Sequence, residues 1–273
     1  MSEKKPLGIL SPEAAGLPSE AVLRFLDRIA EADLCMHSFL IIRRGQIAAE
    51  GYWKPFDASF KHRLYSSSKS FASLGIGLLY GEGKIRLTDR IADYFPEYLP
   101  DEPHPYILEA TIRDLLMMST PYRNVTYVTA EGRPIEGSWV RSFFTSVPDH
   151  IPGTLFFYDT TATTVLTALV EKLSGQKLLD YLREKALGEI GFSDDAWCIE
   201  TPEGVSWAGS GIIATTRDFA KTALLCRNHG RWEGKQLIPE DYMRAATTRQ
   251  IDVSDGKRSF AWSMNYPGYG YQF

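Results

Sequence analysis

Cysteine and histidine are scarce in this chain of 273 residues. The three cysteines, Cys35, Cys198 and Cys226, are widely spaced, and no Cys-x-x-Cys pair exists. An odd, scattered set of this kind predicts neither a disulfide framework nor a zinc site. The five histidines are equally dispersed, so each is expected to be a surface or structural residue rather than a metal ligand. We therefore expect a protein without a metal or other cofactor.

Long apolar stretches and clusters of positive charge are missing as well. No apolar run approaches the ~20 residues that a membrane-spanning helix needs, and no apolar stretch of the secretory-signal type follows the charged residues 1–6. Lys and Arg total 30 against 34 Asp and Glu, which gives a net charge of −4. A nucleic-acid binder would normally carry a basic patch. The sequence therefore predicts a protein with no membrane or nucleic-acid partner. It also predicts a cytoplasmic location, unless a signal was removed ahead of Met1. The oligomeric state does not follow from the sequence.

What the chain does contain is an ordinary globular composition, with 44% hydrophobic and 23% charged residues. Its length suits one large domain or two lobes. Two apolar runs, 38–42 and 47–53, flank a glycine-containing turn and predict a β-hairpin. The continuous apolar character of 38–42 predicts a strand buried on both faces. Because a lone hairpin is not stable, strands from elsewhere must complete this sheet.

Helical periodicity accounts for most of the remaining chain. The predicted helices are 11–33, 66–79, 91–95, 111–118, 139–144, 161–173, 178–187, 216–228 and 239–247. Apart from its short helix, the segment 119–150 is irregular, and we expect it to form a lid or a cleft wall. The chain ends with a strand-like run at 260–266. A sheet made only of the hairpin and this strand would be incomplete, so we expect the natural domain to continue beyond Phe273.

Four Ser-x-x-Lys tetrads occur in the chain, and their surroundings separate them. They begin at Ser2, Ser66, Ser174 and Ser254, whereas roughly one is expected by chance. Only Ser66 opens a helix that is apolar for most of its length, with Lys69 one turn in. The other three tetrads lie in a charged tail, at a helix end and in a polar turn. The tetrad that begins at Ser66 is therefore the candidate catalytic motif.

The spacing of Ser66 and Lys69 suits nucleophilic catalysis. Residues i and i+3 of a helix are neighbours on its surface, so the two side chains can meet. A serine hydroxyl becomes a good nucleophile when a base takes its proton. Lowering the pKa of a lysine to near 7 so that it can be that base costs about 4 to 5 kcal/mol, and burial acts in this direction. The backbone N–H of Ser66 offers half of an oxyanion hole. The structural alternative is that Ser66 only caps the helix.

Five segments resemble one known group of proteins. Residues 65–71, Tyr-Ser-Ser-Ser-Lys-Ser-Phe, resemble the nucleophile motif of the serine β-lactamase and penicillin-binding-protein superfamily, most closely its class C-like esterase and peptidase branch. The segments that agree with the same branch in order are 83–96, 111–116, 152–158 and 209–221. Each segment alone is a weak match, but five in register are specific. The resemblance extends over about residues 11–273.

The resemblance implies an α+β fold of the DD-peptidase and β-lactamase type. An antiparallel sheet flanked by helices would stand beside a mainly helical lobe, with the active site between them. On this basis the sheet lobe is discontinuous and comprises 1–62 and 205–273. The helical lobe would comprise 63–204 and carry the site residues.

The resemblance also implies roles for individual residues. Ser66 would be the acylated nucleophile and Lys69 would help to deprotonate it. Tyr158 would be the general base or a proton shuttle, and since a phenol has a pKa of about 10, a nearby cation such as Lys69 would have to lower it. A second Tyr-x-Asn sequence, at 122–124, lacks the Pro-Gly lead-in and the following helix, so we reject it.

Three further residues, Thr160, Gly209 and Ser210, are expected to contact the substrate. The chain departs from the family pattern at Thr160, where the family has Asn, and at 118–121, which replaces a His-Thr-Ser-Gly-like turn. The Lys-Thr-Gly or His-x-Gly strand, which lines the cleft and supplies a second oxyanion N–H, is not in this sequence.

Together these features predict a serine hydrolase that forms an acyl-enzyme through Ser66 on a small-molecule or peptide substrate. The substrate would be an ester, an amide or a β-lactam. The alternative is a non-catalytic binding or scaffold protein on the same fold; Thr160 and the missing strand favour it, and the presence of Ser66, Lys69 and Tyr158 together opposes it. A Ser-His-Asp hydrolase is disfavoured because no Gly-x-Ser-x-Gly elbow occurs.

Overall fold

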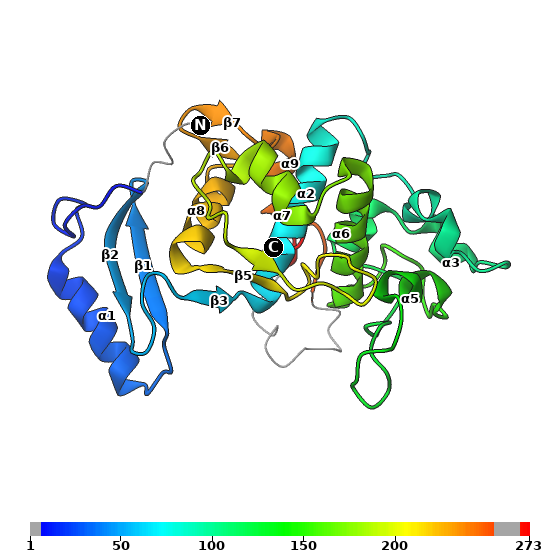
Figure 1. The fold of residues 1–273 in the computed structure, drawn as a ribbon, viewed down its shortest axis with the longest axis horizontal. Coiled ribbons are helices and arrows are strands. Elements are labelled where there is room, and N and C mark those ends of the chain that lie inside the picture. The colour runs from blue at the N-terminus through cyan, green and yellow to red at the C-terminus, as the bar shows by residue number, and fades with distance from the viewer. Residues whose placement is uncertain (1–6, 254–267) are drawn as a thin grey trace.

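The computed structural model describes residues 7–253 and 268–273 (Figure 1). Within these residues it shows a group of helices, a short three-stranded antiparallel sheet, and a two-stranded hairpin at one side that is covered by one helix. The strand predicted at 260–266 lies outside the described residues. No helix in the described part of the chain is both long and apolar enough to cross a membrane.

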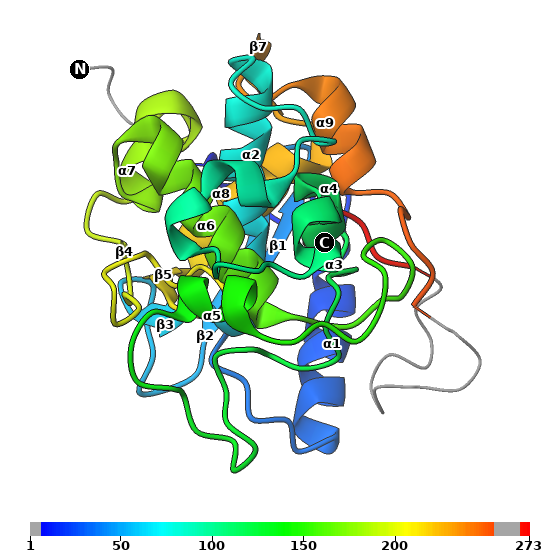
Figure 2. The same ribbon diagram turned by 90° about the vertical axis from the view of Figure 1, so that its right-hand side faces the viewer.

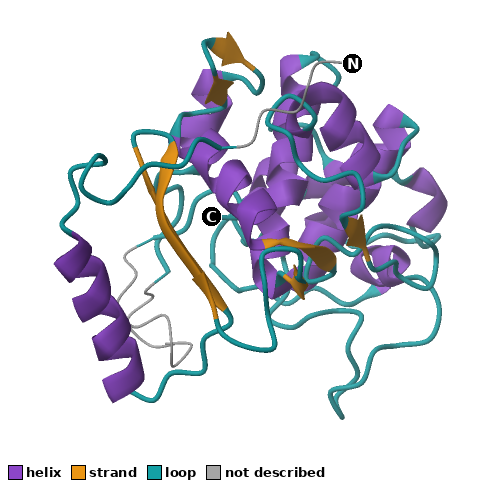
Figure 3. Ribbon diagram, turned by 60° about the vertical axis from the view of Figure 1, so that its left-hand side comes forward, coloured by secondary structure: helices purple, strands orange, loops and turns teal. Residues whose placement is uncertain are grey.

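The predicted hairpin is present, and one helix covers it. β1 (Ser38–Arg43) pairs antiparallel with β2 (Gln46–Tyr52). α1 (Ser19–Glu31) lies along the hairpin on the side away from the other helices (Figure 3). The expectation that the first strand is buried on both faces was wrong, because every residue of β1 is half-buried or exposed. Among the described residues β1 pairs only with β2, so its second edge lacks a strand.

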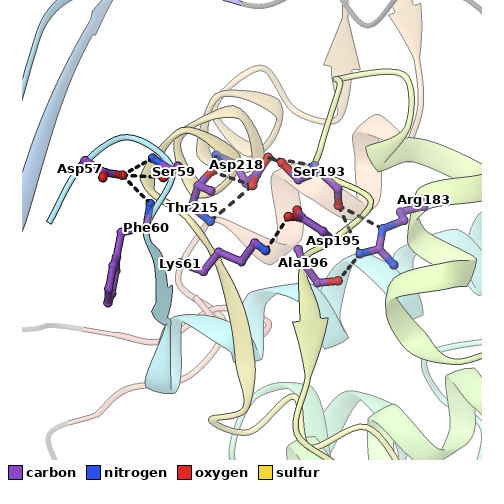
Figure 4. Close-up of polar contacts among 10 residues, drawn as sticks. All are labelled: Asp57, Ser59, Phe60, Lys61, Arg183, Ser193, Asp195, Ala196, Thr215 and Asp218. Carbon is purple, nitrogen blue, oxygen red and sulfur yellow. Dashed lines mark hydrogen bonds and ion pairs between the residues drawn. The ribbon is translucent and has the colours of Figure 1, made fainter.

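A three-stranded sheet brings the start of the Ser66 segment beside residues from late in the chain. β3 (Lys61–Arg63) and β4 (Trp197–Cys198) both pair antiparallel with β5 (Ile212–Thr215), giving the order β3-β5-β4. Polar contacts fix the edge of this sheet, including an ion pair of 2.5 Å between Lys61 Nζ and Asp195 Oδ2 (Figure 4). The loop before β5 therefore lies next to the turn that carries Ser66.

α2 (Lys69–Gly81) runs through the middle of the helices (Figures 1 and 2). It packs against α6 (Thr160–Ser174), α7 (Leu178–Leu182) and α9 (Glu240–Ala246). The two glycines inside α2 are the points of closest approach. A Cβ on Gly75 would lie 2.9 Å from Val170, and one on Gly77 would lie 2.7 Å from the Tyr242 ring. The missing side chains at these two positions therefore let α6, α7 and α9 approach the backbone of α2.

The remaining elements surround this core. They are η1 (Tyr65–Ser68), η2 (Ile91–Tyr94), η3 (Pro96–Tyr98), α3 (Pro105–Glu109), α4 (Ile112–Leu116), α5 (Trp139–Thr145), η4 (Arg183–Leu187), α8 (Thr216–Arg227), β6 (Arg231–Trp232) and β7 (Lys235–Gln236). The predicted helices are present with bounds shifted by a few residues in most cases, although 91–94 is a 3-10 helix. The helix predicted from Ser66 begins at Lys69, and Ser66 lies in the preceding 3-10 turn. Two of them begin with a reciprocal capping box, Thr111 with Asp114 and Thr215 with Asp218.

Candidate active site

The candidate nucleophile lies on a sharp turn between β3 and α2. Tyr65, a non-glycine residue, adopts the left-handed region with φ 47°, a conformation that costs of order 1–3 kcal/mol and tends to occur at functional sites. The turn continues as η1, so Ser66 is exposed while Lys69, the first residue of α2, is 1% exposed. The guanidinium of Arg63 lies over the Tyr65 ring, 4.8 Å from its centre.

The structure brings Ser66 and Lys69 into contact, as their spacing predicted. Lys69 Nζ donates a hydrogen bond of 3.1 Å to Ser66 Oγ. It donates a second one of 2.5 Å to the carbonyl oxygen of Gly209, in the loop before β5. These two acceptors aim the amine at the hydroxyl. The contact with Gly209 joins residues that are far apart in the chain.

Burial changes the protonation of Lys69. Desolvation lowers the pKa of its amine from 10.5 to about 7, and the negative charge of Asp159 acts in the opposite direction. Near neutral pH a large fraction of Lys69 is therefore neutral, which is the form that can accept a proton from Ser66.

Tyr158 is the third member of the cluster. A general base would have to be deprotonated, but the surroundings of Tyr158 favour its protonated form. Lys69 Nζ lies over the face of the Tyr158 ring, 4.9 Å from the ring centre. Burial raises the pKa of Tyr158, and a hydrogen bond with Ser66 opposes that rise. A phenol of this kind stays protonated at neutral pH, which favours a proton donor or shuttle over a general base.

The three predicted substrate-contacting residues lie around the cluster, and each already has protein partners. Gly209 holds Lys69 through its carbonyl oxygen. Ser210 accepts hydrogen bonds from Arg63 at its carbonyl oxygen, 2.9 Å, and at its hydroxyl, 3.3 Å. Thr160 is the first residue of α6; its hydroxyl interacts with Tyr127, and a Cβ on Gly209 would lie 2.4 Å from its methyl group. Of the three, Gly209 contacts Lys69 directly, Ser210 binds Arg63, and Thr160 packs against Gly209.

Sequence reasoning missed a buried carboxylate, Asp159, beside the cluster. It caps α6 by accepting a hydrogen bond of 2.8 Å from the N–H of Thr161, and it accepts one of 3.0 Å from the hydroxyl of Thr120. Asp159 is 0% exposed. The pattern Asp-Thr-Thr before an apolar helix is a cap signal, and it would have located the helix start but not the burial.

The departure at 118–121 has a structural role here. The carbonyl oxygen of Met118 accepts a hydrogen bond from the N–H of Phe157, and that of Ser119 accepts one from the N–H of Gly153, both at 2.8 Å. Together with the hydrogen bond from Thr120 to Asp159, these contacts hold the segment that carries Tyr158 against the turn at 118–121. The rejected Tyr-x-Asn sequence is part of the core, because Tyr122 is 1% exposed and donates its hydroxyl to the carbonyl of Phe143.

Cavity size alone does not identify this site. A groove of about 610 Å³ lies between β1 and α8, and its lining includes Phe39, Ile42 and Phe219 but none of the clustered residues. No group of three His, Cys, Asp or Glu side chains within 7–253 and 268–273 is arranged to hold a metal ion. The arrangement of nucleophile, amine and phenol is what points to Ser66.

The fold and the site together define a class: a mixed α+β protein of the β-lactamase and penicillin-binding-protein type, with a Ser-x-x-Lys pair at the start of a buried helix. The family model described as Beta-lactamase matches residues 35–273. The chain therefore belongs to the Beta-lactamase family, and the resemblance and the fold class expected from the sequence are confirmed.

Proteins with different names share this fold. The chain is 23% identical to a 6-aminohexanoate-dimer hydrolase of Paenarthrobacter ureafaciens, over 94% of this chain and 71% of the relative. Its fold resembles that of a Bacillus anthracis protein assigned provisionally as a 6-aminohexanoate-dimer hydrolase (TM-score 0.71, 20% identity, 90% of this chain). It also resembles the octameric penicillin-binding protein homologue of Pyrococcus abyssi (TM-score 0.69, 19% identity, 93% of this chain). The chain spans 66% and 64%, respectively, of the length of these two solved chains.

Proposed function

We propose that this protein is a serine hydrolase that acts through an acyl-enzyme on Ser66. The observation that carries the proposal is the buried Lys69, whose Nζ lies 3.1 Å from Ser66 Oγ and whose pKa burial lowers to about 7. Keeping an amine in this state opposes stability, and perturbed groups of this kind cluster at functional sites.

The proposed reaction follows from the contacts. Neutral Lys69 takes the proton of Ser66 as Oγ forms a bond to the carbonyl carbon of the substrate. The N–H of Ser66, in the first turn where N–H groups lack helical partners, donates to the developing oxyanion. Tyr158 donates its proton to the leaving alcohol or amine as the carbon–oxygen or carbon–nitrogen bond breaks, and it regains a proton from the Lys69 ammonium. Water then attacks the acyl carbon and gives a proton to neutral Lys69; the bond to Ser66 Oγ breaks, Oγ takes that proton back, and the acid product leaves.

The proposed substrate class is an ester, an amide or a β-lactam. The relatives named above support the amide within this class, since two of them bear the name 6-aminohexanoate-dimer hydrolase and an amide bond is the link that an amine and a carboxylate form. Release of 6-aminohexanoate from its dimer, hydrolysis of a nitrophenyl ester and turnover of nitrocefin would distinguish the three. Ester hydrolysis without nitrocefin turnover would favour an esterase.

Covalent labelling tests the nucleophile directly. A fluorescent fluorophosphonate should react with the intact chain: Ser66 Oγ forms a bond to phosphorus, fluoride leaves, and Lys69 takes the serine proton. Mass spectrometry should find one adduct on Ser66, and Ser66→Ala should abolish it.

Ser67→Ala is the matched control, because Ser67 is the neighbouring exposed serine of the same turn. This variant should label like the unmodified chain. Absence of any adduct on the unmodified chain would favour the non-catalytic binding protein instead. An adduct that survives Ser66→Ala would contradict the assignment of Ser66 as the nucleophile.

A further inference from the structure

Asp159 is a fully buried carboxylate that the reaction proposed above leaves unused. It lies between Tyr158 and the first residue of α6, and it is 0% exposed. Its two oxygens accept hydrogen bonds from the N–H of Thr161 and the hydroxyl of Thr120. A cap alone needs no charge here, because Ser, Thr or Asn also caps a helix. A buried charge in this position therefore calls for a second role.

The titratable groups that face Asp159 come from two other parts of the fold. Tyr122 and Tyr127, in the loop that follows α4, interact electrostatically with it. From α2 the cation Lys69 does so. Lys69 Nζ gives its hydrogen bonds to Ser66 and Gly209 rather than to Asp159, so the two charges interact through space. The low dielectric of the interior makes such an interaction strong.

We propose that Asp159 is a positioning residue whose negative charge stabilises the ammonium form of Lys69 and so sets the pH at which Lys69 can deprotonate Ser66. The proposal deepens the acyl-enzyme function proposed above and rests on it. The two chain neighbours of Asp159 both lie at the amine: the Tyr158 ring centre is 4.9 Å from Lys69 Nζ, and the methyl group of Thr160 packs against Gly209, whose carbonyl oxygen binds Lys69. Two hydrogen bonds and complete burial fix the carboxylate between them. In this way Asp159, the capping residue of α6, would act through Lys69 on Ser66 in η1.

The protonation states follow the same geometry. Burial lowers the pKa of Lys69 to about 7, and Asp159 raises it from the still lower value that burial alone would give. Burial raises the pKa of Asp159 itself to about 6, while the hydrogen bond from Thr120 lowers it. Near neutral pH Asp159 is therefore mostly ionised. Removing its charge should leave Lys69 neutral down to a lower pH.

The pH dependence of fluorophosphonate labelling tests this role. Labelling rates of the intact chain should fall on the acid side with a midpoint near pH 7, where Lys69 gains its proton. In Asp159→Asn that midpoint should move down by about one pH unit, because an opposite charge nearby shifts a pKa by roughly 1–3 units. Asn keeps the capping oxygen, so the loss of charge is the main change.

Asp218→Asn is the matched control. Asp218 is also a buried carboxylate at a helix start, 1% exposed, and accepts hydrogen bonds from the hydroxyl of Thr215 and the N–H of Ser193 (Figure 4). This variant should lose stability but keep the labelling midpoint of the unmodified chain. A shift of equal size in both variants would show a general effect of destabilisation and would overturn the proposal.

Thr120→Val provides a second, independent test of the role of Asp159 if the Asp159→Asn variant does not fold. Loss of the Thr120 hydroxyl should raise the pKa of Asp159, so Asp159 is less ionised and the midpoint moves down by a smaller amount. If the unmodified chain is not labelled, the proposed function fails. If it is labelled and the midpoint stays in place or rises in the folded variant, only the role of Asp159 fails.

Discussion

A lysine that is 1% exposed lies at the centre of the site, and its burial opposes folding. In the unfolded chain the amine has its ordinary pKa of 10.5, whereas in the folded chain the pKa is about 7. Because the folded value is lower, the unfolded state binds the extra proton as pH falls. The resulting loss of stability begins below about pH 10 and is complete below about pH 7, where it amounts to about 5 kcal/mol. Such a cost indicates a side chain retained for chemistry.

Lys69→Met should therefore raise the free energy of unfolding while abolishing fluorophosphonate labelling. We expect a gain of about 3 kcal/mol near neutral pH, less than the full cost because the hydrogen bond to Gly209 is lost and Asp159 is left buried without a cation beside it. The gain should shrink as pH rises toward about 10, where the amine is neutral in both states. Urea denaturation at several pH values measures it.

Lys61→Met serves as the control for this stability prediction. Lys61 is a partly exposed lysine of β3, paired with Asp195. Replacing it should change stability by less than about 1 kcal/mol, since surface ion pairs contribute little. A Lys69→Met variant that is less stable than the unmodified chain near neutral pH would contradict the assignment of Lys69 as a desolvated amine.

At the scale of elements, α2 is a helix selected for close packing rather than for helix propensity. It is buried on nearly all sides, and its two interior glycines let α6, α7 and α9 approach its backbone. The ring of Tyr242 occupies the space that a side chain at Gly77 would need. That ring is fixed, because its hydroxyl donates a hydrogen bond of 2.9 Å to the carbonyl oxygen of Ser73.

Gly77→Ala should accordingly destabilise the protein by about 1 to 3 kcal/mol, the usual range for an overpacked core. The better helix propensity of Ala, about 1 kcal/mol, offsets part of the steric cost. The midpoint of urea denaturation should fall without a change in its slope. A more stable variant would mean that propensity outweighs packing in α2.

At the scale of the whole molecule, the hairpin of β1 and β2 depends on α8. Arg217 Nε donates a hydrogen bond of 3.0 Å to Glu50 Oε2 of β2, and Arg217 also bonds the second carboxylate oxygen. The hydroxyls of Ser38 and Thr216 lie 2.8 Å apart in the same interface. The bond from Arg217 is the main cause that lowers the pKa of Glu50, with burial acting against it.

A double-mutant cycle with Glu50→Gln and Arg217→Gln should give a coupling free energy of about 1 kcal/mol at neutral pH. The folded pKa of Glu50 is the lower one, so this stabilisation is present at neutral pH and is lost as pH falls through that value, below about 4.5. The pair Glu20 and Arg24 of α1 is the control. Its side chains are 85% and 68% exposed, and its coupling should be near zero. Equal coupling in both pairs would contradict a specific link between α8 and the hairpin.

Local patterns predicted a large part of this architecture. The hairpin, the capped helix that follows Thr111, and the helix that ends at Gly175 follow from alternation, caps and a left-handed glycine, all of which act over a few residues. The pairing of Ser66 with Lys69 belongs to the same category, because helical spacing sets it. Burial was predicted less well: β1 has an apolar sequence but is half-buried, since burial depends on which other segments cover it.

By itself, then, the sequence determined that Ser66 and Lys69 would meet at the start of an apolar helix, since covalent spacing and periodicity are local properties. Only the tertiary structure decided the state of that pair. The carbonyl of Gly209 and the carboxylate of Asp159 come from segments far along the chain. Desolvation and electrostatic attraction act through space, so no local pattern could show that the lysine would be poised near neutral pH.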